Sequence, residues 1–334
     1  MHSIWQKNRS YSFLRPYVDA CTRASYRWIK MKGTIPEGKA VILSPNHTNT
    51  LMDALVVLQS RRAETVFGAR ADIFKKPVAA RALRFLRILP LARQRDGLRE
   101  VLNNHASFEE IDDTLAHGVP FCLFPEGRHR TMHSLLPIGK GIARIALASA
   151  AVRPTLIVPA GIEYGDWFRY RMPCTLTYGE PLDVNAFVEA NRELGEADLY
   201  RALREEIGRR MSQLILYLPD DETYPERWAA IEQARRKPAP WWKWPVLAVT
   251  APFFAVSALL TLPMWLTAEL IPLKDKAWRN SIRFLLRLVG TPLMLLVWAL
   301  VWLLACPWPA AVAVLVYFLF SYSIFYDWLN LLHR

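Results

Sequence analysis

Short apolar runs alternate with helical patterns over the first two thirds of the chain. The strand-like runs lie at residues 40–43, 65–68, 88–91, 119–124, 155–159 and 174–178. Apolar residues recur at helical spacing near residues 49–60, 76–86, 96–117, 140–151 and 196–217. This alternation predicts an α/β domain with a mostly parallel sheet flanked by helices. Ligands of such sheets bind at the carboxyl ends of the strands.

The pattern changes after residue 244 to long runs without charge. Residues 245–268 carry no charged side chain, and neither do residues 288–326, which a CPWP sequence interrupts. A spanning helix needs roughly 20 apolar residues, so the second run fits two helices joined at CPWP. The tryptophans at 241, 242 and 244 precede the first run, as aromatic anchors do at a membrane interface. The sequence therefore predicts a C-terminal α-helical membrane region.

The loop between the two apolar runs is basic, which favours the cytoplasmic side of a membrane. Its cations are Lys274, Lys276, Arg279, Arg283 and Arg287. A full crossing by residues 245–271 would place this loop opposite the α/β domain. We therefore expect that segment, broken by Pro252 and Pro263, to dip into the membrane and return, with residues 288–326 crossing and returning as a hairpin. Three simple spans are the alternative.

These patterns divide the chain into five parts. We expect an amphipathic N-terminal helix over 1–32, the α/β domain over 33–220, a linker over 221–244, membrane helices over 245–326 and a tail over 327–334. The N-terminus has no apolar core of signal-peptide length. We therefore expect a membrane protein whose α/β domain lies on the cytoplasmic face.

Composition narrows the choice of partner. Lys and Arg number 42 against 30 Asp and Glu, for a net charge of +12, which suits an anionic partner. A hydrophobic content of 52% fits a protein that meets membrane lipids and argues against a nucleic-acid-binding module. Four scattered cysteines, Cys21, Cys122, Cys174 and Cys306, indicate neither a zinc site nor a disulfide framework. Without an HExxH motif or a carboxylate cluster, we expect no metal.

The sequence SPNHTNTLMDAL at residues 44–55 places a histidine between a strand and a helix. Residues six apart lie on different faces of a helix, so His47 must precede the helix to fold back onto Asp53. Asp53 would then accept a hydrogen bond from one imidazole nitrogen and leave the other free to take a proton from a hydroxyl. A lone histidine is more often structural or solvated, and that interpretation stays open.

The sequence FPEGRHR at residues 124–130 also follows a strand. Gly127 permits a turn with positive φ. Arg128 and Arg130 offer planar guanidinium groups suited to phosphate oxygens. Glu126 is expected to accept backbone N–H groups and brace the turn. His129 is expected to be a neighbour on the surface.

NHTNTLMD and FPEGRHR, followed by VPAGIEY, resemble the PlsC-type glycerophospholipid acyltransferases over about residues 35–185. That family usually has four residues between its NH and Asp. Five stand here, as in a subset resembling glycerol-3-phosphate and lysophospholipid acyltransferases. The resemblance implies a glycerolipid acyltransferase-like fold, with His47 as the base and Asp53 as the residue that orients it. It also implies substrate-binding roles for Asn46, Arg93, Arg95, Glu126, Gly127, Arg128 and Arg130. Each arginine could instead be a solvated side chain.

The reaction implied by the resemblance moves a fatty acyl group from acyl-CoA or acyl carrier protein to a hydroxyl of a lysophospholipid such as lysophosphatidate, or of glycerol 3-phosphate. The thioester is a substrate, and no cofactor is expected. A lipid or thioester hydrolase is one alternative, but it needs a nucleophile, and the sequence offers Ser44 without a GxSxG elbow. A non-catalytic scaffold that binds anionic lipid is another, and it leaves the His–Asp pair unexplained.

Overall fold

The computed structural model describes residues 3–61, 63–92, 104–235 and 238–333. Its central sheet has eight strands among these residues. They are β1 (Ile29–Lys32), β2 (Ala40–Pro45), β3 (Val66–Arg70), β4 (Ile88–Leu91), β5 (Phe121–Leu123), β6 (Thr155–Tyr164), β7 (Cys174–Tyr178) and β8 (Leu182–Asp183). The strand order is β1-β7-β6-β2-β5-β3-β4, with β8 beside β6. Neighbours run parallel except where β6 meets β7 and β8, so the prediction of a mostly parallel sheet is confirmed.

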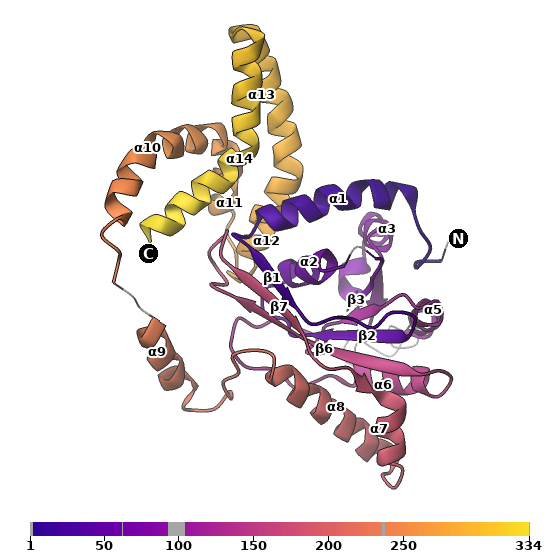
Figure 1. Ribbon diagram of the computed structural model, residues 1–334. Coiled ribbons are helices and arrows are strands. Elements are labelled where there is room, and N and C mark those ends of the chain that lie inside the picture. The colour runs from indigo at the N-terminus through magenta and orange to yellow at the C-terminus, as the bar shows by residue number, and fades with distance from the viewer. Residues whose placement is uncertain (1–2, 62, 93–103, 236–237, 334) are drawn as a thin grey trace.

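Helices cover both faces of this sheet (Figure 1). The helices of the domain are α1 (Arg9–Ala24), α2 (Leu51–Gln59), η1 (Ala71–Phe74), α3 (Pro77–Phe85), α5 (Asn104–Ala116), α6 (Lys140–Ala150), α7 (Val184–Ala190) and α8 (Glu196–Ser212). Helices α1 and α2 lie over one face, and α6, α7 and α8 lie over the other. The result is a three-layer α/β/α domain.

Strand β2 lies in the middle of the sheet and is buried along its whole length. Ile42 packs into the core beneath α6 and α8, whereas Val41 and Leu43 pack into the core beneath α1 and α2. Burial on both faces explains why this strand is a continuous apolar run. Leu43 pairs with Cys122 of β5, so the segments that follow these two strands leave the sheet side by side.

Helix α1 packs one face on the domain and exposes the other. The guanidinium of Arg15 donates to the carbonyl oxygens of Leu58, in the last turn of α2, and of Arg61, just after it, at 2.5 and 2.7 Å. Phe13 and Leu14 are exposed on the opposite side. The helix is thus amphipathic, as expected from the sequence, with one face on the domain and the other exposed.

Several elements were not expected from the sequence. Residues 29–32 form the edge strand β1, so the expected N-terminal segment ends inside the sheet. Strand β8 and helix α7 are short and add little apolar pattern. The expected linker contains a helix, α9 (Tyr224–Arg235). The expected tail is helical as far as residue 332.

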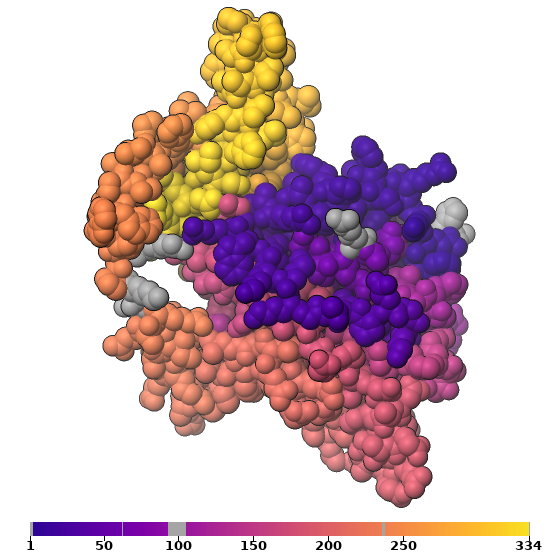
Figure 2. Space-filling view, viewed as in Figure 1, coloured from indigo at the N-terminus to yellow at the C-terminus, as the bar shows by residue number. Residues whose placement is uncertain are grey.

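The C-terminal region consists of helices that project from the domain (Figures 1 and 2). They are α10 (Lys243–Leu260), α11 (Leu262–Leu270), α12 (Trp278–Leu285), the π-helix η3 (Leu286–Gly290), α13 (Thr291–Ala305) and α14 (Trp308–Leu332). Three continuous helical segments, Lys243–Leu260, Trp278–Ala305 and Trp308–Leu332, are long and apolar enough to cross a membrane. The chain reverses between α13 and α14 at Cys306 and Pro307, where the sequence predicted a turn.

Candidate active site

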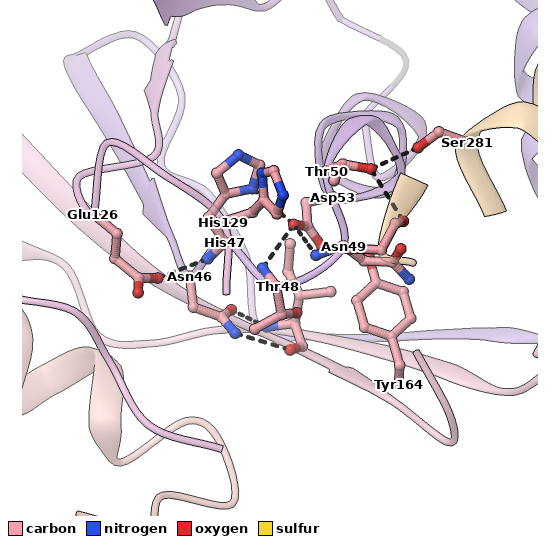
Figure 3. A network of polar contacts seen from close by, with 12 residues as sticks. Asn46, His47, Thr48, Asn49, Thr50, Asp53, Glu126, His129, Tyr164 and Ser281 are labelled. Carbon is pink, nitrogen blue, oxygen red and sulfur yellow. Dashed lines mark hydrogen bonds and ion pairs between the residues drawn. The ribbon is translucent and has the colours of Figure 1, made fainter. Parts of the chain in front are cut away.

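His47 lies in the loop between β2 and α2 and turns back onto the first turn of that helix (Figure 3). Its Nδ1 atom is 2.8 Å from Oδ2 of Asp53. The Asp53 side chain is fully buried, whereas 19% of the His47 side chain is exposed. Five residues separate His47 from Asp53, one more than is usual in the PlsC-type acyltransferases. This extra residue does not prevent their contact.

Asp53 is held by four hydrogen bonds. Its Oδ2 atom accepts the backbone N–H groups of Thr48 and Asn49, at 2.8 and 2.7 Å, besides the His47 ring. Its Oδ1 atom accepts the hydroxyl of Tyr164 at 2.6 Å. A buried carboxylate needs such partners to remain ionised, and these four fix its position against the imidazole.

The contact with Asp53 sets the tautomer of His47. An ionised carboxylate can only accept hydrogen bonds, so Nδ1 carries the proton and the lone pair lies on Nε2. No described residue forms a hydrogen bond with Nε2. The partly exposed ring thus presents a basic nitrogen outward, as a general base requires.

The FPEG turn after β5 fixes the backbone of the His47 loop. The Glu126 carboxylate accepts the N–H of His47 at 2.7 Å and the N–H of Leu136 at 2.8 Å. Burial raises the pKa of Glu126 in spite of these two bonds. Gly127 adopts φ of +67°, which glycine tolerates at little cost. Glu126 therefore braces the loop, as expected, and directs none of its described bonds toward a substrate.

Two aromatic rings flank the imidazole of His47. Phe124 stacks on it with ring centroids 4.4 Å apart, and His129 stands edge-on to it at 5.7 Å. Nε2 of His129 is in turn 2.7 Å from Oδ2 of Asp275, which precedes α12. His129, expected only as a surface neighbour, thus joins the site to the C-terminal region.

Asn46 and Thr50 hold the two ends of this loop. The side chain of Asn46 donates to the carbonyl oxygen of Ile162 at 3.1 Å and accepts its N–H at 2.6 Å, so it extends the pairing of β2 with β6. Because both the nitrogen and the oxygen of this amide bond to backbone, Asn46 positions the loop. Thr50 has φ of +50° and ψ of −125°, a strained conformation for a non-glycine residue, and its hydroxyl contacts that of Ser281 in α12 at 2.6 Å.

The arginines expected to bind phosphate differ in their surroundings. Arg128 is exposed and forms no hydrogen bond or ion pair with the residues that the structure describes. The guanidinium of Arg130 pairs with Asp220 at 2.5 Å and donates to Ser134 at 2.7 Å. Arg93 and Arg95 lie outside the described residues.

Three features of the site escaped the sequence. Tyr164 stands in the sequence VPAGIEY, yet nothing there indicated that its hydroxyl reaches Asp53. Asp275 and Ser281 belong to a segment interpreted as a membrane loop, and their contacts with His129 and Thr50 arise from tertiary packing. Ser44, the nucleophile offered by the hydrolase alternative, is buried with its hydroxyl on the sulfur of Met211.

Comparison with known proteins gives consistent matches to one region of the chain. Residues 29–163 match the family model described as acyltransferase. The chain is 36% identical over 89 residues to glycerol-3-phosphate O-acyltransferase 2 of Saccharomyces cerevisiae. It is 27% identical over 120 residues to an uncharacterized acyltransferase of Schizosaccharomyces pombe.

These matches cover a limited part of each protein. The matched segments are 26% and 35% of this chain, and they span 12% and 18% of the length of the two yeast proteins. Among solved structures, the chain is similar to the 1-acyl-sn-glycerophosphate acyltransferase PlsC from Thermotoga maritima. That likeness has a TM-score of 0.43 at 22% identity, and covers 64% of this chain and 85% of that one.

Proposed function

We propose that this chain, whose residues 29–163 match the acyltransferase family model, transfers a fatty acyl group from a thioester to a hydroxyl of a phosphorylated glycerolipid precursor. The observation that carries this proposal is the bond from Nδ1 of His47 to the buried carboxylate of Asp53. It leaves Nε2 as a base on a partly exposed ring, with no nucleophilic side chain beside it among the described residues. An alcohol supplied by the substrate then takes the place of a protein nucleophile.

In the proposed reaction, Nε2 of His47 removes the proton of the acceptor hydroxyl as its oxygen attacks the thioester carbonyl. The carbon–sulfur bond of the resulting tetrahedral intermediate breaks, and the imidazolium returns the proton to the departing thiolate. The products are an ester and a free thiol, so atoms and charge balance without an acyl-enzyme. Asp53 stabilises the imidazolium while it exists and keeps the ring oriented.

A phosphate on the acceptor suits the cations near the site. Arg128 is exposed and unengaged among the described residues, and Arg130 lies two positions further on the same turn. Arg130 would have to exchange Asp220 for a phosphate in order to bind one. One of the yeast proteins that the chain matches is a glycerol-3-phosphate O-acyltransferase. We therefore propose glycerol 3-phosphate or its 1-acyl derivative as the acceptor, and acyl-CoA or acyl carrier protein as the donor.

The proposal includes attachment to a membrane with the catalytic domain on the cytoplasmic face. Three long apolar helical segments support the attachment. The basic residues between α11 and α13 support the cytoplasmic placement, because such loops are retained on that side.

The test is turnover by a His47→Ala variant in lipid vesicles or detergent. Purified protein would be given labelled acyl-CoA with glycerol 3-phosphate or lysophosphatidate, and the lipid product would be measured. Loss of the general base should lower the rate by roughly 10²- to 10⁴-fold. His105→Ala is the matched control, because that side chain is 84% exposed on α5 and pairs with Glu109 of the same helix.

Two outcomes would overturn the proposal. Wild-type turnover by a folded His47→Ala protein would remove the base from the mechanism. Release of free fatty acid at the same rate with and without acceptor, and without an acylated product, would identify a thioester hydrolase instead.

A further inference from the structure

The hairpin formed by α12, α13 and α14 begins and ends against the catalytic domain. The guanidinium of Arg171, in the loop before β7, pairs with Asp327 near the end of α14 at 2.6 Å. At the other end of the hairpin, Asn280 of α12 donates to the carbonyl oxygen of Trp167 at 2.8 Å. A helix pair that starts and finishes on the same domain cannot leave its two ends on opposite sides of a membrane.

Helices α10 and α11 form a second hairpin that also returns to the side of the catalytic domain. Near the start of α10, the carbonyl oxygen of Leu247 accepts the Trp328 indole at 3.4 Å, which places it beside the attached end of α14. The chain breaks at Thr261 and α11 returns, and Arg279 of α12 binds the carbonyl oxygen of Ile271 at 3.1 Å. Asp275 then contacts His129 in the active site.

We propose that the protein is anchored by two re-entrant hairpins, α10–α11 and α12–α14, which enter a lipid bilayer from the catalytic side and end inside it. The exposed apolar side chains of both hairpins contact the acyl chains of that bilayer. Three simple spans would move Asp275 to the far side, away from His129. The contact between these two residues therefore excludes that topology for this fold.

The part of the longer hairpin that rises beyond the catalytic domain is close in length to the hydrocarbon core of a bilayer. Its base is marked by Tyr17 of α1, whose hydroxyl donates to the carbonyl oxygen of Leu288 at 2.7 Å, and by Arg287, which bonds to Ser323 at 2.9 Å. Beyond this base, residues 288–305 rise about 27 Å at 1.5 Å per residue. The hydrocarbon core of a bilayer is about 30 Å thick, so the tip of an upright hairpin lies deep in that core, and tilt brings the tip nearer to the catalytic side.

The tip of this hairpin has the chemistry of a turn inside hydrocarbon. Leu304 and Trp308 are 81% and 73% exposed, and the tip carries no charged side chain. Backbone groups in lipid must be satisfied within the protein. The N–H of Cys306 bonds to the carbonyl oxygen of Trp302, and that of Ala310 bonds to the carbonyl oxygen of Pro307, both at 3.0 Å. Pro307 and Pro309 have no N–H to satisfy.

The loop between the two hairpins has the opposite character. Lys274, Asp275 and Lys276 stand together there, and the first and last are cations that favour the cytoplasmic side. Two re-entrant hairpins require a polar loop on the catalytic side of the bilayer and an apolar tip within its hydrocarbon core.

Cys306 is a native reporter at the tip. Cys21, Cys122 and Cys174 are buried in the catalytic domain, whereas Cys306 is partly exposed. We would express the full chain and prepare sealed membrane vesicles of both orientations. A membrane-impermeant maleimide would then be added with and without detergent. In a Cys306→Ser background, His105→Cys marks the side of the catalytic domain and Lys276→Cys marks the loop.

The proposal expects Lys276→Cys and His105→Cys to react in the same vesicles, and Cys306 to react in neither orientation until detergent is added. Reaction of Lys276→Cys from the opposite face would establish simple spans and overturn it. Reaction of Cys306 from the opposite face would show a complete crossing. Reaction of Cys306 from the catalytic face, or an intermolecular Cys306 disulfide, would show that water or a second copy of the chain covers the tip. None of these results depends on acyl transfer.

Discussion

His129 and Asp275 join the catalytic domain to the membrane region, with Nε2 of the histidine 2.7 Å from Oδ2 of the carboxylate. The ring of His129 stands edge-on to that of His47, with centroids 5.7 Å apart and planes at 80°. Asp275 therefore acts on the proposed base through His129. Burial by itself would raise the pKa of Asp275, but the bonds from His129 and from the Ala277 N–H outweigh that effect and lower it.

This relationship makes Asp275 a positioning residue whose loss should affect turnover more than substrate binding. We expect Asp275→Ala to lower kcat by about 3- to 10-fold, because a typical hydrogen bond contributes about 1 kcal/mol, and to leave KM nearly unchanged. Asp275→Asn keeps an oxygen that can accept from His129 and should recover most of the rate. Steady-state kinetics in vesicles would measure both.

Lys274→Ala is the matched control for this prediction, since it removes a charge from the same loop without touching His129. An Asp275→Ala variant with normal kcat would show that the contact does not orient His47. A rise in KM alone would instead place Asp275 in substrate binding.

Tyr164 should matter for stability and modestly for rate. Its hydroxyl is one of four donors to Asp53, and hydrogen bonds to charged groups contribute about 1.5–3 kcal/mol. We expect Tyr164→Phe to lower the free energy of unfolding by an amount in that range. The rate should fall by less than about 10-fold, because the bond from His47 to Oδ2 remains.

Tyr178→Phe provides the comparison for Tyr164→Phe. It also deletes a buried hydroxyl, which contacts Ser60 at 2.6 Å, but this contact is neutral and away from Asp53. The Tyr178→Phe substitution should lower the free energy of unfolding by about 0.5–1.5 kcal/mol and leave turnover unchanged. Thermal unfolding with parallel rate measurements would separate the two variants. Equal effects of both on rate would mean that Tyr164 does not support the His–Asp pair.

The central part of the site could be predicted because it depends on local sequence. The apolar run 40–43 ends just before His47, and the helical pattern begins just after it, so the loop position of the histidine followed from periodicity alone. Helix geometry then allowed a contact with Asp53, and the resemblance to the PlsC-type acyltransferases implied it. The bracing role of Glu126 followed in the same way from a turn after a buried strand.

The rest of the site depends on long-range packing, which periodicity does not encode. Tyr164 reaches Asp53 across 111 positions of sequence, and Asp275 reaches His129 across 146. Strand β1 was missed for another reason. It is an edge strand with three exposed residues of four, so it lacks the apolar alternation that identifies a strand.

Glu126 should make stability depend on pH in an unusual direction. Burial raises its pKa, so the folded chain binds a proton more readily than the unfolded chain does. Its contribution to the free energy of unfolding therefore falls as pH rises above the ordinary glutamate range and through the raised pKa. In the Glu126→Gln variant this dependence is absent. We expect the stability of wild type relative to the variant to be greater at pH 5 than at pH 7.5.

Thermal unfolding of wild type and Glu126→Gln at the two pH values would measure this difference. Glu222→Gln, an exposed change in the segment before α9, is the control and should show no such trend. A difference that shrinks as pH falls would contradict the direction assigned to Glu126.

His133 should act in the opposite direction over the same range. Its ring packs against both Trp167 and Trp228, with centroids 4.5 and 4.4 Å away, and so helps to hold α9 on the domain. Burial, and then the charge of Arg235, lower its pKa from 6.5 to about 4. Below pH 6.5 the unfolded chain takes up a proton before the folded one, so stability is lost as pH falls from 6.5 toward 4.

A His133→Phe variant keeps an aromatic ring against the two indoles but cannot titrate. We expect wild type to lose more stability than this variant between pH 7.5 and pH 5, as measured by thermal unfolding. His117→Phe, a half-exposed position on the same domain, should follow wild type. As pH falls from 7.5 to 5, the contribution of Glu126 to the free energy of unfolding rises and that of His133 falls. The pH profile of wild type alone therefore cannot separate the two, whereas the difference between wild type and each variant does. A His133→Phe protein with the same pH dependence as wild type would show that the ring is not kept neutral by its burial.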